Sequence, residues 1–600
     1  MAKAKASKLK LSGKRAQSFA RLGAFLALIV FVNILGNMAH GRLDLTEENR
    51  FTLSEPTVDL LKQLDEPVFV QVLLEGEFPA GFKHLQRSTR EMLDDFRNEA
   101  SSFQGRGKGL SLGQRIKAFF NFLGNDVNLE YEFVDPNLGS VEEINQRREQ
   151  LAKDGIVPTI FRLKDVEGTE EKLIYPYAIF NYKGRSVPVN LLENQPGLNQ
   201  DEKINQSVTL LEYKFANAIQ KLLLERKRVI AFTTGHGELE ELQTKDLSNT
   251  LRTYYDVGRF HLDSNYQVPS QIDLLIVAKP RGPFSDRDKF KLDQYVMNGG
   301  KILWLIDRLD AELDSLAVRD PFVPTDYPTN LEDLLFKYGA RVEPNLVLDL
   351  QCSSIPQVIG MQGGNPQIEL FPWVYHPVVT PRSDHPIVKG LDQINLFFPS
   401  RIDTIRTKTE VAKTILLTTS EYSREQYSPV RLTFDILRYE PDPAQFKKPF
   451  LPVAVLLEGQ FPSLYENRVT DEMLEGLRQL GMEYKTVSEP TGMLVVSDGD
   501  IAANFITNPE TRGVMPLGYN RYERRQYANK DFLINSIEYL LDEGGVIEAR
   551  GKDIKLRLLD TVRAQSQKTL WQLLNIGTPL LFLALFGWGF NYYRKNRFAK

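Results

Sequence analysis

The chain has 600 residues, with 74 lysine and arginine against 78 aspartate and glutamate residues, so its net charge is −4. This length predicts three or four domains, and the single cysteine, Cys352, excludes an internal disulfide. Eleven of the positive charges lie in residues 1–21 and 594–600, which hold no acidic residue, so the remainder carries about −15. Such an acidic remainder excludes the basic surface that nucleic-acid binding requires.

The chain begins with a basic tail, residues 1–21, and an apolar segment, residues 22–39, that predicts a first transmembrane helix. A cleaved signal peptide is the alternative, because it also has a basic start before an apolar run. Residues 37–42 follow the apolar segment without a clear small-x-small cleavage motif. This favours a helix that stays in the chain.

Residues 44–225 predict an N-terminal α/β domain. Ser54 stands where it can cap a short helix that begins with Glu55 and Pro56. A β-branched strand at 68–74 and an amphipathic helix at about 81–100 follow it.

Residues 226–440 predict a central doubly wound α/β domain. Short apolar strands alternate in this region with amphipathic helices, which favours a parallel sheet covered on both faces. The expected strands lie at 228–234, 273–278 and 301–306, and the expected helices at about 246–255 and 284–298. Residues 345–420, which are rich in proline, are expected to continue this domain as long loops.

Residues 450–550 predict a small C-terminal α/β domain, with strands at 453–457 and 493–496 and a helix at 531–541. The last segments are expected to be a juxtamembrane helix at 551–569, a second transmembrane helix at 570–590 and a cytoplasmic tail at 591–600. Because both ends are basic, the positive-inside rule places both termini in the cytoplasm and the bulk of the chain outside it.

A glycine-rich turn is the first candidate site, made of Gly235, His236, Gly237 and Glu238. It follows the first expected strand of the central domain, where open α/β sheets bind ligands. His236 and Glu238 are candidate acid, base or ligand contacts, and the glycines would let a backbone approach a ligand. A tight turn with solvated polar residues is the alternative interpretation.

Polar residues in the two expected spans are candidate partner contacts, because amide side chains form hydrogen bonds between membrane helices. They are Asn33, Gln572 and Asn575. A basic, aromatic stretch at 519–530 is a second candidate surface for a polysaccharide, an acidic partner or a neighbouring subunit. Its arginines are Arg521, Arg524 and Arg525, and a solvated turn is the alternative.

Motifs of common catalytic sites are absent from the sequence. It has no GxxxxGK[ST] loop for ATP and no GxSxG nucleophile elbow. Its cysteine has no nearby histidine, and its histidines lack metal-ligand spacing. The sequence therefore predicts neither catalytic residues nor a metal or other cofactor, and any ATP hydrolysis is expected from another subunit.

Six motifs, in order along the chain, resemble the GldG family of gliding-motility proteins. They are RFTLSEPT at 50–57, VLLEGEFPAGF at 72–82, TTGHGE at 233–238, LPVAVLLEGQFPS at 451–463, VVSDGDIAANF at 495–505 and NKDFLINSIEYLLDE at 529–543. The resemblance covers nearly the whole chain, including both terminal spans.

The resemblance implies an auxiliary subunit of an ABC transporter in the inner membrane of gliding Bacteroidota. Its implied partners are a GldF-like permease and a GldA-like ATPase. It also implies a flavodoxin-like central domain, similar to a class I glutamine amidotransferase without its catalytic machinery and shared with an intraflagellar transport protein. It implies no catalytic residue.

The sequence and the resemblance leave three functions open. The first is a non-catalytic auxiliary subunit whose large periplasmic region binds cargo or partners, or relays ATPase-driven motion. The second is a passive membrane-anchored periplasmic protein that binds a cell-envelope glycan or a peptide. The third is a hydrolase that acts through His236 and Glu238.

Overall fold

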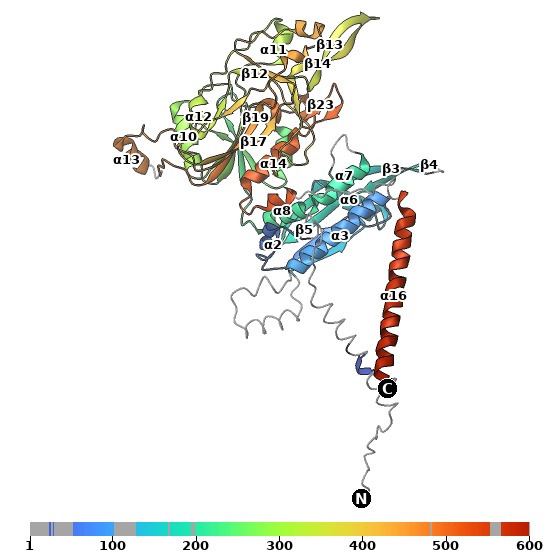
Figure 1. Ribbon diagram of the computed structural model, residues 1–600. Helices are drawn as coiled ribbons and strands as arrows, with labels where there is room; N and C mark the ends of the chain where they lie inside the picture. The colour runs from blue at the N-terminus through green and yellow to red at the C-terminus, as the bar shows by residue number, and fades with distance from the viewer. Residues whose placement is uncertain are drawn as a thin grey trace. The chain divides into compact units, whose positions relative to one another are not determined.

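The computed structural model describes residues 23–25, 28, 52–100, 128–165, 168–193, 199–479, 483–551 and 566–598. The chain divides into two compact units: the first comprises residues 1–44 and 51–552, and the second residues 45–50 and 553–600 (Figure 1). The expected first transmembrane helix, with Asn33, lies outside the described residues except at positions 23–25 and 28. Most of the expected juxtamembrane helix lies outside them as well.

The N-terminal part of the first unit is built on a four-stranded sheet with the order β2-β1-β5-β6. Its strands are β1 (Val68–Val72), β2 (Leu129–Phe133), β5 (Tyr177–Tyr182) and β6 (Arg185–Asn190). Strands β1 and β2 are parallel, and the other neighbours are antiparallel. The further elements are α2 (Glu55–Leu61), α6 (Val141–Lys153), α7 (Gln200–Thr209), β3 (Thr159–Asp165) and β4 (Gly168–Ile174).

Helices α3 (Ala80–Ala100) and α8 (Leu211–Leu223) share a hydrophobic core with this sheet. Alternate residues of β1 are buried in that core, because successive side chains of a strand point to opposite faces. Phe215 of α8 joins the layers, since its ring lies 5.8 Å from that of Phe96 and 5.2 Å from that of Phe180.

The central sheet has seven strands in the order β17-β19-β20-β10-β9-β7-β8. Five of them are parallel: β7 (Val229–Thr234), β8 (Asp256–His261), β9 (Ile272–Ala278), β10 (Lys301–Leu305) and β20 (Thr491–Val496). Strands β19 (Pro452–Gly459) and β17 (Val411–Thr418) extend the sheet by antiparallel pairing. Numbered along the chain, the parallel strands have the order 2-1-3-4-5 of a flavodoxin-like sheet.

Each face of the central sheet carries its own helices, as expected from its continuous apolar strands. Ile230, Ile276 and Leu303 face a core shared with α9 (Lys245–Arg252) and α14 (Asn529–Leu541). Leu275 and Trp304 face the opposite core, which α10 (Asp286–Met297) and α12 (Glu332–Tyr338) cover. The result is a mixed α/β unit with a central parallel sheet.

The segment 450–550 differs from the expectation of a separate small domain. Its strand β20 pairs with β10 in parallel, with Met493 opposite Ile302, and β19 pairs with β20. Both strands therefore belong to the central sheet. The physical reason is that β20 is buried on both faces, so it needs a layer of helices on each side, which the central sheet supplies.

The proline-rich region forms antiparallel strands where long loops were expected. Its pairs are β11 (Ala340–Val342) with β16 (Ile402–Thr404), β12 (Asn345–Asp349) with β18 (Ser423–Tyr427), and β13 (Cys352–Gln362) with β14 (Asn365–Val379), to which β15 (Ile394–Asn395) adds. Trp373, Tyr375 and Leu348 anchor a separate core beneath them. Short elements elsewhere include α11 (Leu313–Val318), α13 (Asp471–Gln479), β21 (Ile506–Asn508) and β22 (Gly513–Val514).

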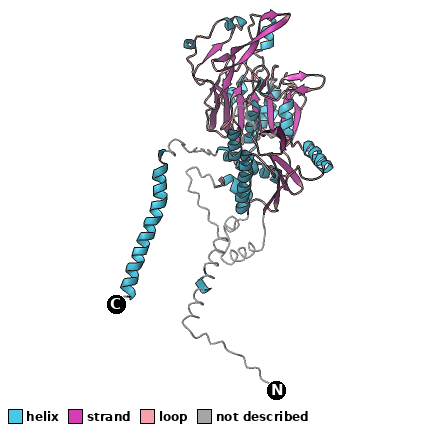
Figure 2. Cartoon of the chain, turned by 90° about the vertical axis from the view of Figure 1, so that its right-hand side faces the viewer, coloured by secondary structure: helices cyan, strands magenta, loops and turns pink. Residues whose placement is uncertain are grey.

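The described part of the second unit is dominated by one helix, α16 (Lys568–Phe598) (Figure 2). Within Lys568–Arg597 an 18-residue window has a mean hydropathy of 1.6, and the helix is long and apolar enough to cross a bilayer. Its last turn carries Lys595 and Arg597. This agrees with the expected C-terminal membrane anchor at 570–590.

Candidate functional site

The carboxyl edge of the central parallel sheet is the place to look for a site in this fold. Strand β8 lies on one side of β7 and β9 on the other, so the chain changes direction between β7 and β9. Ligands of doubly wound sheets bind at such a switch point, beyond the carboxyl ends of the strands. The turn Gly235–Glu238 follows β7, as predicted, and residues 279–282 follow β9.

A buried charge cluster fills this edge beyond strands β9, β10 and β20. Lys279 is 1% exposed, and its Nζ lies 2.7 Å from both carboxylate oxygens of Asp500. The same Nζ lies 3.1 Å from Glu312 and 3.4 Å from Asp307. The Lys279 backbone has a φ of 51°, and a Cβ at Gly499 would lie 2.6 Å from the Lys279 Cβ. Only glycine at position 499 therefore lets the two loops approach this closely.

The electrostatics of the cluster favour one retained proton. Burial, followed by the Asp500 charge, raises the pKa of Asp307 to about 7, although Lys279 and the Gly499 amide act in the opposite direction. Burial and the charge of Asp307 also raise the pKa of the Asp498 carboxyl well above its usual range. Burial alone would lower the pKa of Lys279, but the carboxylates of Asp500 and Asp307 outweigh it and raise that pKa.

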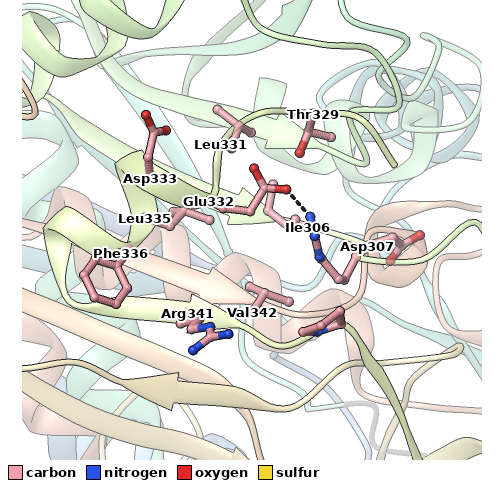
Figure 3. Close-up of a pocket in the computed structure, with 12 residues that line it drawn as sticks. Ile306, Asp307, Thr329, Leu331, Glu332, Asp333, Leu335, Phe336, Arg341 and Val342 are labelled. Carbon is pink, nitrogen blue, oxygen red and sulfur yellow. Dashed lines mark hydrogen bonds and ion pairs between the residues drawn. The ribbon is translucent and has the colours of Figure 1, made fainter. Parts of the chain in front are cut away.

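A pocket of about 380 Å³ lies beside this cluster, beyond β10 (Figure 3). Asp307 is one of its lining residues, together with Leu331, Phe336 and others of α12 and its flanks. Arg308 crosses its rim, where it pairs with Glu332 and, at 2.6 Å, with Asp326. The charged groups at the rim are therefore already paired with one another.

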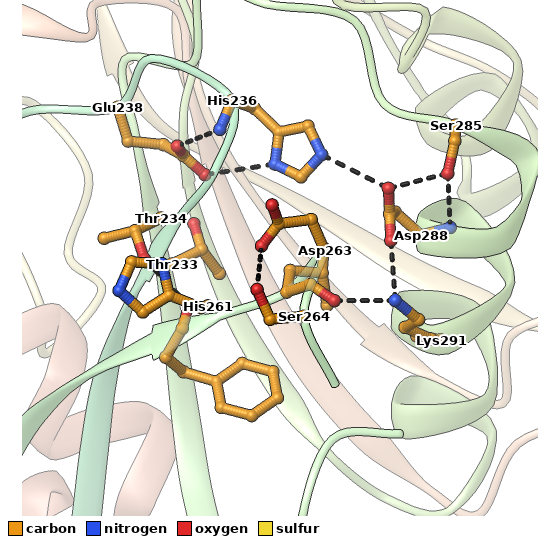
Figure 4. A network of polar contacts seen from close by, with 12 residues as sticks. Thr233, Thr234, His236, Glu238, His261, Asp263, Ser264, Ser285, Asp288 and Lys291 are labelled. Carbon is orange, nitrogen blue, oxygen red and sulfur yellow. Dashed lines mark hydrogen bonds and ion pairs between the residues drawn. The ribbon is translucent and has the colours of Figure 1, made fainter. Parts of the chain in front are cut away.

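His236 lies in a second polar network at the same edge (Figure 4). Its Nε2 is 3.4 Å from Asp288 Oδ2, and its Nδ1 is 3.6 Å from Glu238 Oε1. Its ring stacks on Phe284, with 3.7 Å between centroids and 7° between planes. Asp288 also accepts hydrogen bonds from Ser285 and from Lys291 Nζ, at 2.6 Å and 2.7 Å.

The carboxylates on either side of His236 favour its charged form. Burial would lower the pKa of His236, but Glu238 first, and then Asp288, raise it above the usual histidine value. Burial likewise opposes the charge of Glu238, yet its contact with His236 leaves its pKa below the usual range. The side chains of His236 and Glu238 are 4% and 1% exposed. They contact each other and α10, and they do not line the pocket beyond β10.

The two glycines of the turn serve the packing of neighbouring loops. Gly235 and Gly237 have φ values of 119° and 75°, which favour glycine. A Cβ at Gly237 would lie 3.3 Å from the Arg281 Cβ. The carbonyl of His236 accepts hydrogen bonds from the amides of Arg281 and Gly282, at 2.9 Å and 2.7 Å. The backbone that the two glycines leave accessible is therefore in contact with the neighbouring loop of the same chain, at Arg281 and Gly282.

The arginine stretch forms a tight hairpin of β23 (Tyr519–Asn520) and β24 (Arg525–Gln526). Arg521 lies over the ring of Phe505, at 3.9 Å, and over that of Tyr522, at 4.5 Å. Arg525 lies 4.9 Å from the ring centroid of Tyr527, while Arg524 is exposed in the turn, with a φ of 53°. The hairpin therefore presents one guanidinium free of ring contacts beside two that stack on rings.

In the second unit, Gln572 and Asn575 stand three residues apart on α16 and share one face of that helix. Both are exposed within that unit. Among the described residues, no group of three or more histidine, cysteine, aspartate or glutamate side chains is arranged to hold a metal ion.

The Lys279 cluster is not among the sites predicted from the sequence. A signal was present, because a charged residue follows closely after three apolar strands of the central sheet: Lys279 after β9, Asp307 after β10 and Asp498 after β20. Parallel strands that end in charges bring those charges to one edge.

Residues 227–536 match a protein-family model described as an ABC-type uncharacterized transport system, and residues 47–105 match a domain of unknown function. An uncharacterized protein of Borreliella burgdorferi is 20% identical over 482 residues, which are 78% of this chain and 83% of that protein. Among solved structures, the mmIFT52 N-terminal domain is similar over 52% of this chain and 97% of its own, with 13% identity and a TM-score of 0.29. The exo-β-1,4-mannosidase Op5Man5 from an Opitutaceae bacterium strain is similar over 56% of this chain and 39% of its own chain, with 12% identity and a TM-score of 0.22.

Proposed function

This chain belongs to the family of the ABC-type uncharacterized transport system, as an auxiliary component, and we propose that it is the membrane-anchored, non-catalytic subunit of such a transporter. On this proposal a GldF-like permease contacts the membrane helices and a GldA-like ATPase supplies the energy, in a complex linked to gliding motility. The bulk of the chain lies in the periplasm of a cell with an inner membrane, and both termini lie in the cytoplasm. The large periplasmic region binds cargo or partners, or relays ATPase-driven motion.

The observation that carries the non-catalytic role is the internal pairing of charged groups at the carboxyl edge of the central sheet. Lys279 and its carboxylates neutralise one another there, and His236 is held between Glu238 and Asp288. A general acid or base must reach a substrate proton within hydrogen-bond distance. Lys279 and His236 are instead buried and paired with carboxylates, which supports a rigid body that transmits force or presents a surface.

Helix α16 supports the attachment to a transporter. Its face with Gln572 and Asn575 can donate and accept hydrogen bonds across a helix interface, where such bonds contribute about 1 kcal/mol each. We propose that this face packs on the permease. Arg524 and its neighbours Arg521 and Arg525 are proposed as a second, periplasmic contact with an acidic partner.

The test is co-purification of the tagged full chain with its permease and ATPase in a mild detergent. Recovery of both partners is the expected result. Replacing Gln572→Leu together with Asn575→Leu lowers the recovered permease several-fold, because both interhelical hydrogen bonds are lost. The matched control is Leu573→Ile with Leu580→Ile on the same helix, which leaves recovery unchanged. Recovery of the chain alone under these conditions contradicts the proposal.

A further inference from the structure

A cavity of about 700 Å³ lies within the first unit, between its N-terminal sheet and the central sheet. Two facing helices supply most of its polar wall. Residues 213, 214, 217, 218 and 221 of α8 line one side, and residues 530, 531, 534, 535 and 538 of α14 line the other. Both sets follow helical spacing, so each helix presents one face to the cavity. Strand β6 and the β23–β24 hairpin contribute further lining residues.

Ion pairs hold the two walls at a fixed separation. Glu538 of α14 accepts hydrogen bonds from Tyr213 and, at 2.7 Å, from Lys221 Nζ, both of α8. Lys214 is similarly paired with Glu193 at 2.7 Å. These contacts satisfy Lys214, Lys221 and Glu538 and leave the space between the walls open.

Two charged groups that line the cavity have no hydrogen-bond or ion-pair partner among the described residues. The Asp531 carboxyl has no hydrogen bond or ion pair with any described residue, although it is accessible and lines the cavity. Arg550, near the end of the 3₁₀ turn η4 (Val546–Gly551), also lines the cavity, and its guanidinium lies 5.7 Å from the ring centroid of Tyr213 but forms no hydrogen bond or ion pair with any described residue. One acceptor and one donor therefore remain available.

The balance of charge argues for a neutral ligand. Lys214 and Lys221 are each paired with a glutamate, Lys530 is paired with Asp246, and Asp531 and Arg550 carry opposite charges, so the cavity has little net charge to select an ion. The remaining lining combines amide side chains, such as Asn217 and Gln526, with apolar ones, such as Ile534. This combination suits a molecule that carries hydroxyl groups around an apolar ring.

An extended peptide fits this cavity less well. Strand β6 is an edge strand, and such an edge can bind a peptide by adding a strand. Its outer edge is blocked, however, because Pro188 has no N–H and its carbonyl accepts a hydrogen bond from Tyr254. The carbonyl of Asn190 is likewise taken by Lys214 Nζ, at 2.7 Å.

We propose that this cavity binds a neutral oligosaccharide segment, with Asp531 accepting from and Arg550 donating to its hydroxyl groups. The volume is in the range that encloses a ligand of drug size, here a disaccharide or trisaccharide. The inference deepens the proposed function, because it names the class of ligand that the auxiliary subunit presents to its transporter.

The test is a glycan array probed with the full chain, purified in a detergent that has no sugar headgroup. Binding to neutral oligosaccharides is expected, and Asp531→Asn and Arg550→Gln each weaken it at least tenfold. Ile534→Trp fills the cavity and abolishes binding while the thermal unfolding temperature stays the same. The matched control is Asp384→Asn, which changes an exposed carboxylate outside the cavity and leaves binding unchanged.

Absence of neutral glycan binding overturns the inference, as does binding that survives both Asp531→Asn and Arg550→Gln. Capture of peptides in place of glycans from a parallel peptide array overturns the ligand class. The same preparations are tested for recovery of permease and ATPase. A chain that recovers its partners but binds no glycan refutes the cavity alone, whereas a chain that binds glycan without partners refutes the transporter role alone.

Discussion

Lys279 and Asp500 are 221 residues apart in the chain, yet Lys279 Nζ lies 2.7 Å from both oxygens of the Asp500 carboxylate. This contact joins the loop after β9 to the loop after β20. It coincides with the pairing of β20 on β10, so that the same part of the sheet is held by backbone hydrogen bonds and by charge. The two chain segments therefore fold as parts of one body.

Removing the cation from this cluster should destabilise the first unit strongly. Lys279→Met leaves the buried Asp307 and the partly buried Asp500 without their counter-charge, and loss of one partner of a buried ion pair costs about 3–5 kcal/mol. Urea unfolding of the full chain at neutral pH, followed by tryptophan fluorescence, measures the change. The control is Lys153→Met, since Lys153 pairs with Glu149 at the surface and such pairs contribute less than about 1 kcal/mol. Equal effects of the two substitutions would refute the role given to Lys279.

The retained proton of the cluster predicts a pH dependence. The pKa of Asp307 rises from 3.8 to about 7 on folding, so the native state binds more protons than the unfolded state between these values. Its contribution to stability is therefore lost as the pH rises from 3.8 to about 7. Asp307→Asn cannot titrate, and the free energy of unfolding should fall less steeply across this window. Urea titrations at closely spaced pH values measure the slope, and an unchanged slope counts against a proton retained by Asp307.

Two buried histidines should respond to pH in opposite directions. Glu238 and Asp288 raise the pKa of His236 above 6.5, so its stabilising charge is present below 6.5 and is lost as the pH rises through the raised value. Burial lowers the pKa of His376 to about 3, so its neutral ring stabilises the fold above 6.5 and this is lost as the pH falls toward 3.

The corresponding variants separate the two effects. His236→Gln should remove the loss of stability that occurs as the pH rises through the raised pKa of His236. His376→Phe should remove the loss of stability that occurs as the pH falls toward 3. His376→Phe should also raise stability at neutral pH, because the His376 Nε2 is buried without a partner among the described residues, beside Phe397 and Phe398. Thermal unfolding at pH 5 and pH 8 compares them, and parallel pH profiles for both variants would contradict the assignment.

Much of the central fold could be predicted from the sequence, because strands such as β7 and β9 are continuous apolar runs between helix signals. The partner of β20 could not be predicted in this way. An apolar strand encodes burial on both faces, but its sequence does not say which strand lies beside it, and Met493 pairs with Ile302 across a long stretch of chain. The antiparallel strands at 340–427 were not predicted for a different reason, because their prolines are also typical of loops.

The location of the glycine-rich turn could be predicted from the sequence, but its role could not. His236 follows β7 directly, which determines its place at the carboxyl edge. Its environment comes from α10, where Asp288 lies 52 residues later and Phe284 precedes the helix. Whether a histidine is open to a ligand or enclosed depends on such distant residues, and no local motif encodes them.

The topology of the chain gives the most direct test of its placement in the membrane. The basic residues at the end of α16 predict a cytoplasmic C-terminus, and the basic residues 1–21 predict the same for the N-terminus. Single cysteines report these positions once Cys352→Ala has removed the one native thiol. In spheroplasts, a membrane-impermeant maleimide should label Asp384→Cys and should label Ser7→Cys and Asn596→Cys only after lysis. Loss of the Ser7→Cys signal even after lysis would mean that the first apolar segment is cleaved, and labelling of Asn596→Cys before lysis would mean that α16 has the opposite orientation.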